Sequence, residues 1–260
     1  MSVTLFLVLA CGLLGLLFGS FANVLVHRLP RGESIVFPGS HCPHCDHAIA
    51  WYDNIPLISW LLLRGSCRHC KAPVALRYPL AEAGLGILWA LLAWRFQLSA
   101  ELGTALVLSF LLWVLAWIDL ETGLLLDVLT KPGIAIGLSL SALAGHALDA
   151  VVGALAGYAV FWLVARIFLL LTGREGMGQG DFKLLAMLGA FLGWQALPFV
   201  IFLSSLVGAV VGSLYLLLTR NSMRAQIPYG PYLAAAGMVW VVWGDVLSRW
   251  LGLPGQGPLL

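Results

Sequence analysis

The amino-acid sequence predicts an all-α polytopic membrane protein with about eight transmembrane helices. Of its 260 residues, 61% are hydrophobic and 10% are charged, whereas about a quarter of the residues of a soluble domain are charged. The mean hydropathy of +0.96 also excludes a disordered chain, because disordered chains are poor in apolar residues. The apolar runs are continuous, unlike the alternating segments of a transmembrane β-barrel. The net charge is only +2, and no basic run indicates nucleic-acid binding.

Eight apolar runs are candidates for the spans, since a helix needs about 20 apolar residues to cross the hydrocarbon core. The first five runs cover residues 1–26, 78–94, 102–118, 124–145 and 150–171. Residues 184–219 carry no charge and are too many for one span. We therefore expect a break at Gly193–Pro198, between a short sixth helix and a long seventh helix. Residues 225–244 form the eighth run.

The positions of lysine and arginine predict the orientation, because these residues accumulate in cytoplasmic loops. With the N-terminus outside, twelve of the 14 lysines and arginines face the cytoplasm, and only Arg95 and Arg249 do not. We therefore expect both termini to lie outside the cytoplasm. Residues 1–26 begin without a positive charge, so we interpret them as a spanning helix rather than as a cleaved signal peptide.

These spans predict four parts of the chain. Residues 1–26 are the first transmembrane helix, and residues 27–77 are a cytoplasmic four-cysteine segment. Residues 78–251 are a seven-helix membrane domain, and residues 252–260 are a C-terminal tail. The four-cysteine segment is the only sizeable non-membrane part, and about fifty residues are few for an unaided hydrophobic core.

Two C-x-x-C pairs in this segment predict a structural zinc site: Cys42 with Cys45, and Cys67 with Cys70. Two such pairs about 20 residues apart are typical of a four-thiolate zinc site, which leaves no open position for catalysis. Disulfides are disfavoured on the reducing cytoplasmic side, and a redox C-x-x-C would need a βαβ context. The flanking histidines are alternative ligands: His41, His44, His47 and His69.

The aromatic segment Trp51–Trp60 lies between the two cysteine pairs. Tryptophan and tyrosine favour the interface between membrane and water. The segment therefore has two interpretations that the sequence leaves open. It lies on the lipid of the inner leaflet, or it forms a lid or substrate platform beside the membrane.

Four acidic residues lie in or at the ends of the predicted spans: Glu82, Asp119, Asp127 and Asp181. Such residues are functional candidates, because charges in membrane spans are costly. The predicted orientation places Asp119 and Asp181 on the same cytoplasmic face, where they can meet. Two neighbouring carboxylates share one proton. The ionised carboxylate can then take a proton from water while the protonated one polarises a peptide carbonyl.

The surroundings of the acids refine these roles. Gly178 and Gly180 precede Asp181 and would let the backbone approach a substrate closely. Helix dipoles favour a charge on Asp181, at a helix N-terminus, and disfavour one on Asp119, at a helix C-terminus. We therefore expect Asp119 to keep the shared proton. For Asp127 we favour a structural role, as a helix N-cap or as a partner of a nearby lysine. Arg77 or an internal polar group is the expected partner of Glu82.

Taken together, the motifs resemble those of the prepilin peptidases, the type IV leader peptidases and prepilin N-methyltransferases of bacteria. The resemblance runs in order from about residue 15 to residue 235. The matching segments are Gly19–Val24, Arg28–Pro30, Cys42–Cys45, Trp51–Trp60, Arg64–Gly65, Cys67–Cys70, Tyr78–Leu80 with Glu82, Ile118–Asp119, Gly178–Lys183 and Pro228–Tyr232. Leu126 and Lys131 depart from the family pattern, which usually has proline and leucine at these positions.

The resemblance implies a membrane aspartic protease of the GxGD type, with Asp119 and Asp181 as catalytic residues. Its substrates would be prepilins and pseudopilins, whose short basic leaders are cut at the cytoplasmic face of the bacterial inner membrane. Many members with the four-cysteine segment also methylate the new N-terminus with S-adenosylmethionine, and the region of Gly65 is tied to that activity. Four residues would support these sites: Glu82, Gly178, Gly180 and Lys183.

Three alternatives stay open at this point. The protein is a peptidase without methyl transfer, or it is an ion-coupled transporter that uses the same acids as a relay. A third possibility is a non-catalytic assembly factor whose zinc segment binds a partner. A transporter often has paired broken helices in two halves, and the sequence predicts only one short helix.

Overall fold

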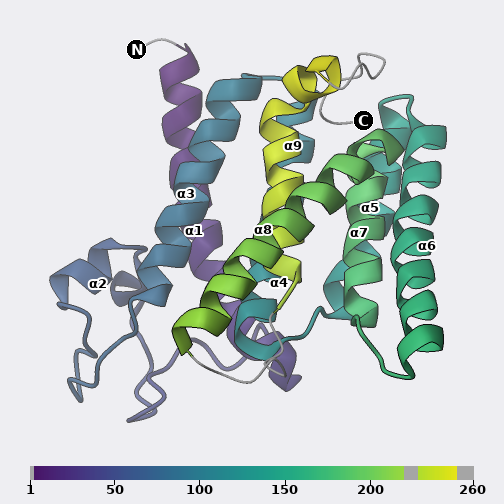
Figure 1. Cartoon of the computed structure of the whole chain (residues 1–260). Helices are drawn as coiled ribbons and strands as arrows, with labels where there is room; N and C mark the ends of the chain where they lie inside the picture. The colour runs from purple at the N-terminus through teal and green to yellow at the C-terminus, as the bar shows by residue number, and fades with distance from the viewer. Residues whose placement is uncertain (1–2, 220–227, 251–260) are drawn as a thin grey trace. The chain divides into compact units, whose positions relative to one another are not determined.

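The computed structural model describes residues 3–219 and 228–250. The chain divides into two compact units, unit 1 (residues 1–106) and unit 2 (residues 107–260) (Figure 1). The regular secondary structure of the described residues is helical, with two isolated bridges and no strand. The all-α prediction is therefore confirmed. Among the described residues, five segments are long and apolar enough to cross a membrane: Val3–Arg31, Ala100–Thr122, Ala147–Thr172, Trp194–Tyr215 and Gly230–Trp250. The membrane class is therefore confirmed, whereas the number of eight spans stays a prediction. The predicted tail, residues 252–260, lies outside the described residues.

Unit 1 is built on two long helices, α1 (Val3–Arg28) and α3 (Arg77–Phe96), which lie side by side in Figure 1. Glycines bring them together. A Cβ added to Gly15 would lie 2.8 Å from the Cα of Gly86, and one added to Gly19 would lie 2.7 Å from the Cα of Glu82. Gly15 and Gly19 form a G-x-x-x-G pattern, which lets membrane helices approach closely. The contact fixes Glu82 beside the C-terminal half of α1.

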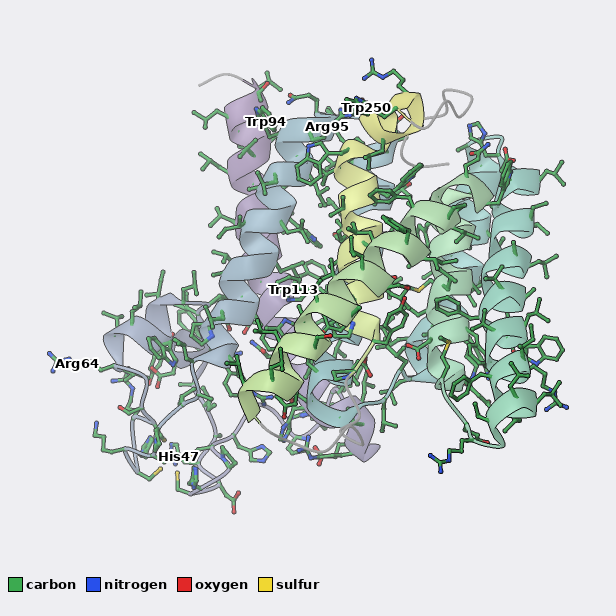
Figure 2. All side chains as sticks on the ribbon, viewed as in Figure 1. His47, Arg64, Trp94, Arg95, Trp113 and Trp250 are labelled. Atoms are coloured by element: carbon green, nitrogen blue, oxygen red, sulfur yellow. The ribbon has the colours of Figure 1, made fainter. Side chains whose placement is uncertain are left out.

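Residues 29–76 connect α1 to α3 and contain little regular structure: η1 (Leu29–Arg31), η2 (Trp51–Asn54) and the five-residue helix α2 (Ile58–Leu62). Figure 2 shows His47 and Arg64 of this connection at one end of unit 1, with Trp94 and Arg95 at the other end. The Arg28 guanidinium organises its start by donating hydrogen bonds to the carbonyls of Ser34, Pro38 and Gly39.

Unit 2 contains the end of α4 (Ala100–Thr122) and five further helices. These are α5 (Asp127–Leu143), α6 (Ala147–Thr172), α7 (Gln179–Leu192), α8 (Leu197–Thr219) and α9 (Gly230–Trp250). α7 is the shortest of these, and all its residues from Leu184 to Leu192 are buried. A helix that is apolar on every side must be enclosed by others, and α5 and α6 flank α7 in Figure 1.

Glycines again permit the close packing around α7. Gly153 of α6 lies against the backbone of Gly189, and a Cβ added to Gly157 would lie 2.6 Å from the carbonyl oxygen of Leu185. On the α5 side, the Ser141 hydroxyl donates a 2.9 Å hydrogen bond to the carbonyl of Ala190. These contacts hold α7 in place, and with it the residues at its N-terminus.

The ends of several helices agree with the sequence, and two do not. The expected break at Gly193–Pro198 is confirmed: α7 ends at Leu192, a short 3-10 turn follows, and α8 starts at Leu197. The expected N-cap role of Asp127 is wrong, because Leu126 is the N-cap and Asp127 is the first residue of α5. α9 begins at Gly230, with Pro231 in its first turn, where proline is favoured. Residues 225–227 of the expected span lie outside the described residues, and the expected span includes Pro228 and Tyr229, which precede the helix.

Candidate active site and metal centre

Asp119 lies in the last turn of α4 and is 5% exposed. Its Oδ2 accepts a 2.8 Å hydrogen bond from the backbone N–H of Gly230, the first residue of α9. A Cβ on residue 230 would lie 2.7 Å from the same oxygen. Only glycine therefore lets the start of α9 come this close to the carboxyl group.

Asp181 lies in the first turn of α7, where it is partly buried and hydrogen-bonded to the backbone of Gly178. The structure brings Asp181 and Asp119 together, close enough for the charge of Asp119 to act on Asp181. Leu125 packs against Gly180, next to Asp181, and against Gly230, whose N–H meets Asp119. Its Cβ would be 2.6 Å from a Cβ on Gly180, and its Cδ2 would be 3.1 Å from one on Gly230.

The start of α9 also bears on which of the two carboxyl groups keeps the shared proton. The sequence placed only Asp181 at a helix N-terminus, and from this we expected Asp119 to keep the shared proton. In the structure Asp119 faces a helix N-terminus as well, that of α9. The N-terminus of α9 therefore opposes the effect of the α4 C-terminus on Asp119. The expectation that Asp119 keeps the shared proton stays a prediction.

Lys183 does not contact the pair directly. Its Nζ forms an ion pair with Asp127 Oδ1, and Lys131 reaches Asp127 Oδ2 at 2.8 Å. Asp127 thus links the starts of α5 and α7, which agrees with the expectation that a nearby lysine is its partner. Lys183 supports the site through the position of α7 rather than through its own charge at the reacting groups.

The sequence assigned no role to three residues that lie near the aspartate pair: Leu125, Tyr229 and Gly230. The Tyr229 hydroxyl is hydrogen-bonded to Ser204 at 2.7 Å and to Ser205 at 3.0 Å, and so ties the start of α9 to α8. Pro228–Tyr232 is one of the segments that match the family, but its sequence does not indicate that the backbone of this segment contacts Asp119.

A groove of about 390 Å³ adjoins these loops in unit 2. Met177 and Tyr229 line it, and they immediately precede the N-terminal turns of α7 and α9. Its walls come from α6, α8 and α9, and none of its lining residues is charged. The surface next to the aspartates therefore suits an apolar chain.

The four cysteines of unit 1 form one cluster. All four sulfurs lie within 4.8 Å of one another, and Cys42 Sγ is 3.7 Å from Cys70 Sγ. A tetrahedral zinc ion with Zn–S bonds of about 2.3 Å would separate its sulfurs by roughly 3.8 Å. The four side chains thus fit a tetrahedral metal ion. The flanking histidines are not part of the cluster. The rings of His47 and His69 contact each other, with centroids 3.4 Å apart and planes tilted by 35°.

Each cysteine pair lies on a turn of the same construction. The N–H of Cys42 bonds to the carbonyl of His47, and the N–H of Cys67 bonds to that of Ala72. Four residues after each of these cysteines, Asp46 and Lys71 have positive φ angles of 54° and 60°. The backbone N–H groups of Cys70 and His69 lower the pKa of the Cys67 thiol to about 6. This favours the thiolate form that binds metals.

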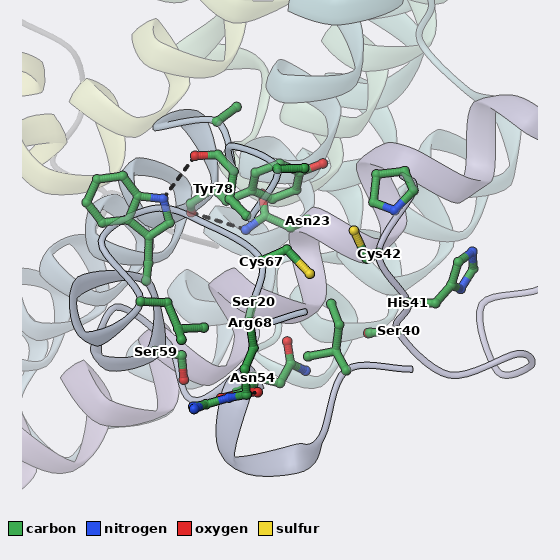
Figure 3. Close-up of a pocket in the computed structure, with 18 of the residues that line it drawn as sticks. Ser20, Asn23, Ser40, His41, Cys42, Asn54, Ser59, Cys67, Arg68 and Tyr78 are labelled. Atoms are coloured by element: carbon green, nitrogen blue, oxygen red, sulfur yellow. Dashed lines mark hydrogen bonds and ion pairs between the residues drawn. The ribbon is translucent and has the colours of Figure 1, made fainter. Parts of the chain in front are cut away.

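Of the two partners expected for Glu82, the structure shows internal polar groups and not Arg77. Glu82 Oε2 accepts a 2.8 Å hydrogen bond from the N–H of Leu57, and the Ser20 side chain forms a second hydrogen bond. Glu82 lines a cavity of about 560 Å³ within unit 1 (Figure 3).

Gly65 does not line this cavity. Gly65 packs against Trp60, and the Trp60 side chain lines the cavity. A Cβ on Gly65 would be 2.8 Å from the Trp60 ring. The ring donates a 3.1 Å hydrogen bond from Nε1 to the carbonyl of Val74. Gly65 is therefore placed to position the cavity wall and not to touch what the cavity holds.

Comparison with known proteins agrees with the two units. Residues 13–96 match the bacterial peptidase A24 N-terminal domain, and residues 106–213 match the type IV leader peptidase family. The first match falls within unit 1, and the second begins at the division between the units. No solved structure matches the chain.

Several proteins named prepilin leader peptidase/N-methyltransferase are similar to nearly the whole chain. The one from Stutzerimonas stutzeri is 45% identical over 266 residues, which cover 93% of this chain and 92% of that protein. The one from Aeromonas hydrophila is 47% identical, with coverage of 92% and 91%. The one from Pseudomonas aeruginosa is 44% identical, with coverage of 93% and 92%. The chain therefore belongs to the type IV leader peptidase family, which its motifs resemble.

Proposed function

We propose that this protein cleaves the leader peptides of type IV prepilins and pseudopilins and then methylates the new N-terminus with S-adenosylmethionine. Both activities, leader cleavage and N-methylation, appear in the name of the similar proteins. Those names give no support to transport, to a non-catalytic assembly factor or to a peptidase without methyl transfer. The observation that carries the peptidase proposal is the pair formed by Asp119 and Asp181 in unit 2.

In the proposed cleavage, the two carboxyl groups hold one proton between them. The ionised carboxylate takes a proton from water, and the resulting hydroxide equivalent adds to the scissile carbonyl. The other carboxyl group donates its proton to the carbonyl oxygen. The leaving amine is then protonated as the C–N bond breaks.

The surroundings of the pair support a peptide substrate with an apolar part. Gly178 and Gly180 leave the backbone beside Asp181 without side chains that would block a substrate. The uncharged groove that begins at Met177 and Tyr229 suits the hydrophobic segment that follows a prepilin leader.

For the cysteine cluster we propose a structural zinc ion. Cys42, Cys45, Cys67 and Cys70 would fill all four tetrahedral positions, so the ion would stabilise the connection between α1 and α3. A metal suits this connection because few of its side chains are buried.

The proposed location is the bacterial inner membrane, with both termini outside and the aspartate pair open to the cytoplasm. The bias of lysine and arginine toward residues 27–77, 119–131, 172–183 and 220–228 supports this orientation.

The test combines purified protein with a prepilin and isotopically labelled S-adenosylmethionine, and the products are identified by mass spectrometry. Asp119→Asn and Asp181→Asn should each reduce cleavage by roughly 10²–10⁴-fold, the usual contribution of a general acid or base. Glu101→Gln is the control and should cleave normally, because Glu101 is an exposed acid in the first turn of α4, at the other end of that helix from Asp119. Full cleavage by either dyad variant would overturn the proposal.

A second arm supplies a pilin that has already lost its leader. Methylation of this substrate should persist in both dyad variants, because it does not depend on peptide cleavage. Absence of any methylated product from the unmodified protein would overturn the methyl-transfer part and leave the peptidase part intact.

A further inference from the structure

The cavity of unit 1 has the size and the mixed chemistry of a site for a small polar molecule. Its volume of about 560 Å³ is within the usual range for ligand pockets. α1 contributes Asn23 and α3 contributes Tyr78, with a 3.2 Å hydrogen bond from the Asn23 amide to the Tyr78 carbonyl (Figure 3). Cys42 and Cys67 stand at its wall. The cavity is thus lined by α1, by α3 and by the cysteine cluster.

Glu82 is a partly buried acid of this cavity, and its partners are both neutral groups, the N–H of Leu57 and the side chain of Ser20. Within the described residues no lysine or arginine pairs with it. The arginines that line the cavity have other acceptors. Arg68 holds Asp53 through two hydrogen bonds of 2.6 and 2.7 Å. Arg28 donates to backbone carbonyls, and Arg77 donates to the Tyr78 hydroxyl. A partly buried carboxylate with only neutral partners attracts a cation, because its charge is poorly screened.

The backbone that binds Glu82 is held in a costly conformation. Leu57 has φ = +61°, a region that a branched side chain rarely adopts. Ser59 maintains the turn, since its hydroxyl accepts the N–H of Ile55 at 3.1 Å and donates to the carbonyl of Tyr52 at 2.8 Å. Strained backbone of this kind is often retained where it positions a functional group. Here it directs the N–H of Leu57 at Glu82.

We propose that this cavity binds the methyl donor and that Glu82 lies against the positive charge of its sulfonium group. The inference rests on the methyl-transfer part of the proposed function. The donor joins a cationic sulfur to an adenosine, so it needs both an acid and apolar walls. The groove of unit 2 has no charged lining residue, whereas the cavity of unit 1 offers Glu82 beside apolar walls from Val24, Ile55 and Pro79.

The reaction itself leaves Glu82 unchanged. The lone pair of the N-terminal amine forms the new N–C bond while the C–S bond breaks, and its electron pair stays on sulfur. The positive charge passes to nitrogen, and the methylated amine releases a proton to water. Because the product thioether is neutral at sulfur, Glu82 should favour the donor over the product.

Titration calorimetry of the full-length protein tests the role of Glu82, with S-adenosylmethionine and S-adenosylhomocysteine as the two probes. Glu82→Gln should weaken binding of S-adenosylmethionine by at least about tenfold, as expected for loss of a charge-assisted contact, and should weaken S-adenosylhomocysteine less. The control is Glu101→Gln, the same change at an exposed acid outside the cavity. Metal content and thermal unfolding check that each variant is folded. Unaltered S-adenosylmethionine affinity in folded Glu82→Gln would overturn the role of Glu82.

Photocrosslinking of labelled S-adenosylmethionine to the unmodified protein tests the location without any variant. The labelled peptides should fall within residues 20–82. Labelling confined to residues 107–250 would overturn the inference while methyl transfer itself still stands. A protein that neither binds the donor nor forms methylated product would overturn both.

Discussion

Unit 2 and unit 1 hold their polar groups by different means. In unit 2 the aspartates lie at helix ends, and these ends are fixed by helices that enclose α7 through glycine contacts. In unit 1 the groups around the cavity come from a connection, residues 29–76, with only one short helix and two 3-10 turns. That connection depends on four sulfurs, on Arg28 and on side-chain hydrogen bonds such as those of Ser59.

The difference shows how each kind of site fails. A site at the ends of packed helices is sensitive to a single added methyl group, because interiors have little free volume. A site on a loop with few buried side chains is sensitive to loss of its cross-link. If two sites in one chain are held so differently, it should be possible to disable either one alone.

Metal removal should have the largest effect and should act on unit 1 only. Chelation of the reduced protein, or Cys67→Ser, should abolish donor binding and leave prepilin cleavage intact. The reason is that a structural zinc contributes roughly 10–16 kcal/mol to the folding of small zinc-finger peptides. Elemental analysis should give about one metal per chain in the unmodified protein.

The control for metal removal is Cys11→Ala, which changes a buried cysteine of α1 outside the cluster and should keep both metal and donor binding. Equal loss of cleavage and donor binding on chelation would contradict the independence of the two units. Undegraded, reduced protein without any metal would contradict the zinc assignment.

Gly230→Ala should have the next largest effect and should act on unit 2 only. The new methyl group would lie 2.7 Å from Asp119 Oδ2, and it must displace the carboxyl group or the start of α9. A misplacement of about 1 Å costs about 10²-fold in rate, so kcat for cleavage should fall by about that factor. Donor affinity measured by calorimetry should not change.

Gly103→Ala is the matched control for Gly230→Ala, because a Cβ at Gly103 of the same helix as Asp119 meets open space. Comparable rates in Gly230→Ala and Gly103→Ala would show that the approach of α9 does not position Asp119.

Gly65→Ala should weaken donor binding about tenfold without affecting cleavage. Its methyl group would overlap the Trp60 ring at 2.8 Å, and Trp60 lines the cavity. Gly32→Ala separates this overlap from backbone strain, since Gly32 has a similar φ of +68° with nothing within 4 Å. If the two variants bind the donor equally, the effect comes from the backbone and not from Trp60.

Asp53→Asn should have the smallest effect, within about fivefold in donor affinity, because Asp53 and Arg68 form an ion pair of the surface type.

Arg68 holds the pKa of Asp53 below its usual value. The contribution of the carboxylate is therefore complete above its unfolded pKa of about 3.9 and is lost only as the pH falls through the lowered value. The difference in thermal midpoint between parent and variant should thus be constant from pH 7 to pH 5. A difference that grows over that range would assign the effect to another group.

Local patterns in the sequence were sufficient for the class of fold, for most helix ends and for the cysteine cluster. Apolar runs identify helices, Gly193–Pro198 marks the break before α8, and two C-x-x-C pairs identify four sulfurs. Each of these signals lies within a few residues of what it predicts. The two aspartates were also recognisable, because acids at the ends of apolar runs are few.

Only the tertiary structure decided which groups surround those residues. The N–H that meets Asp119 comes from Gly230, 111 residues away, and the N–H that meets Glu82 comes from Leu57, 25 residues away in a strained turn. The sequence left two structural roles open for Asp127, a helix N-cap or a lysine partner, and the structure shows the second. Asp127 joins the starts of α5 and α7 through Lys131 and Lys183. The physical reason is the same in each case: helices and turns follow from neighbours along the chain, whereas the environment of a charge depends on which helix ends pack beside it.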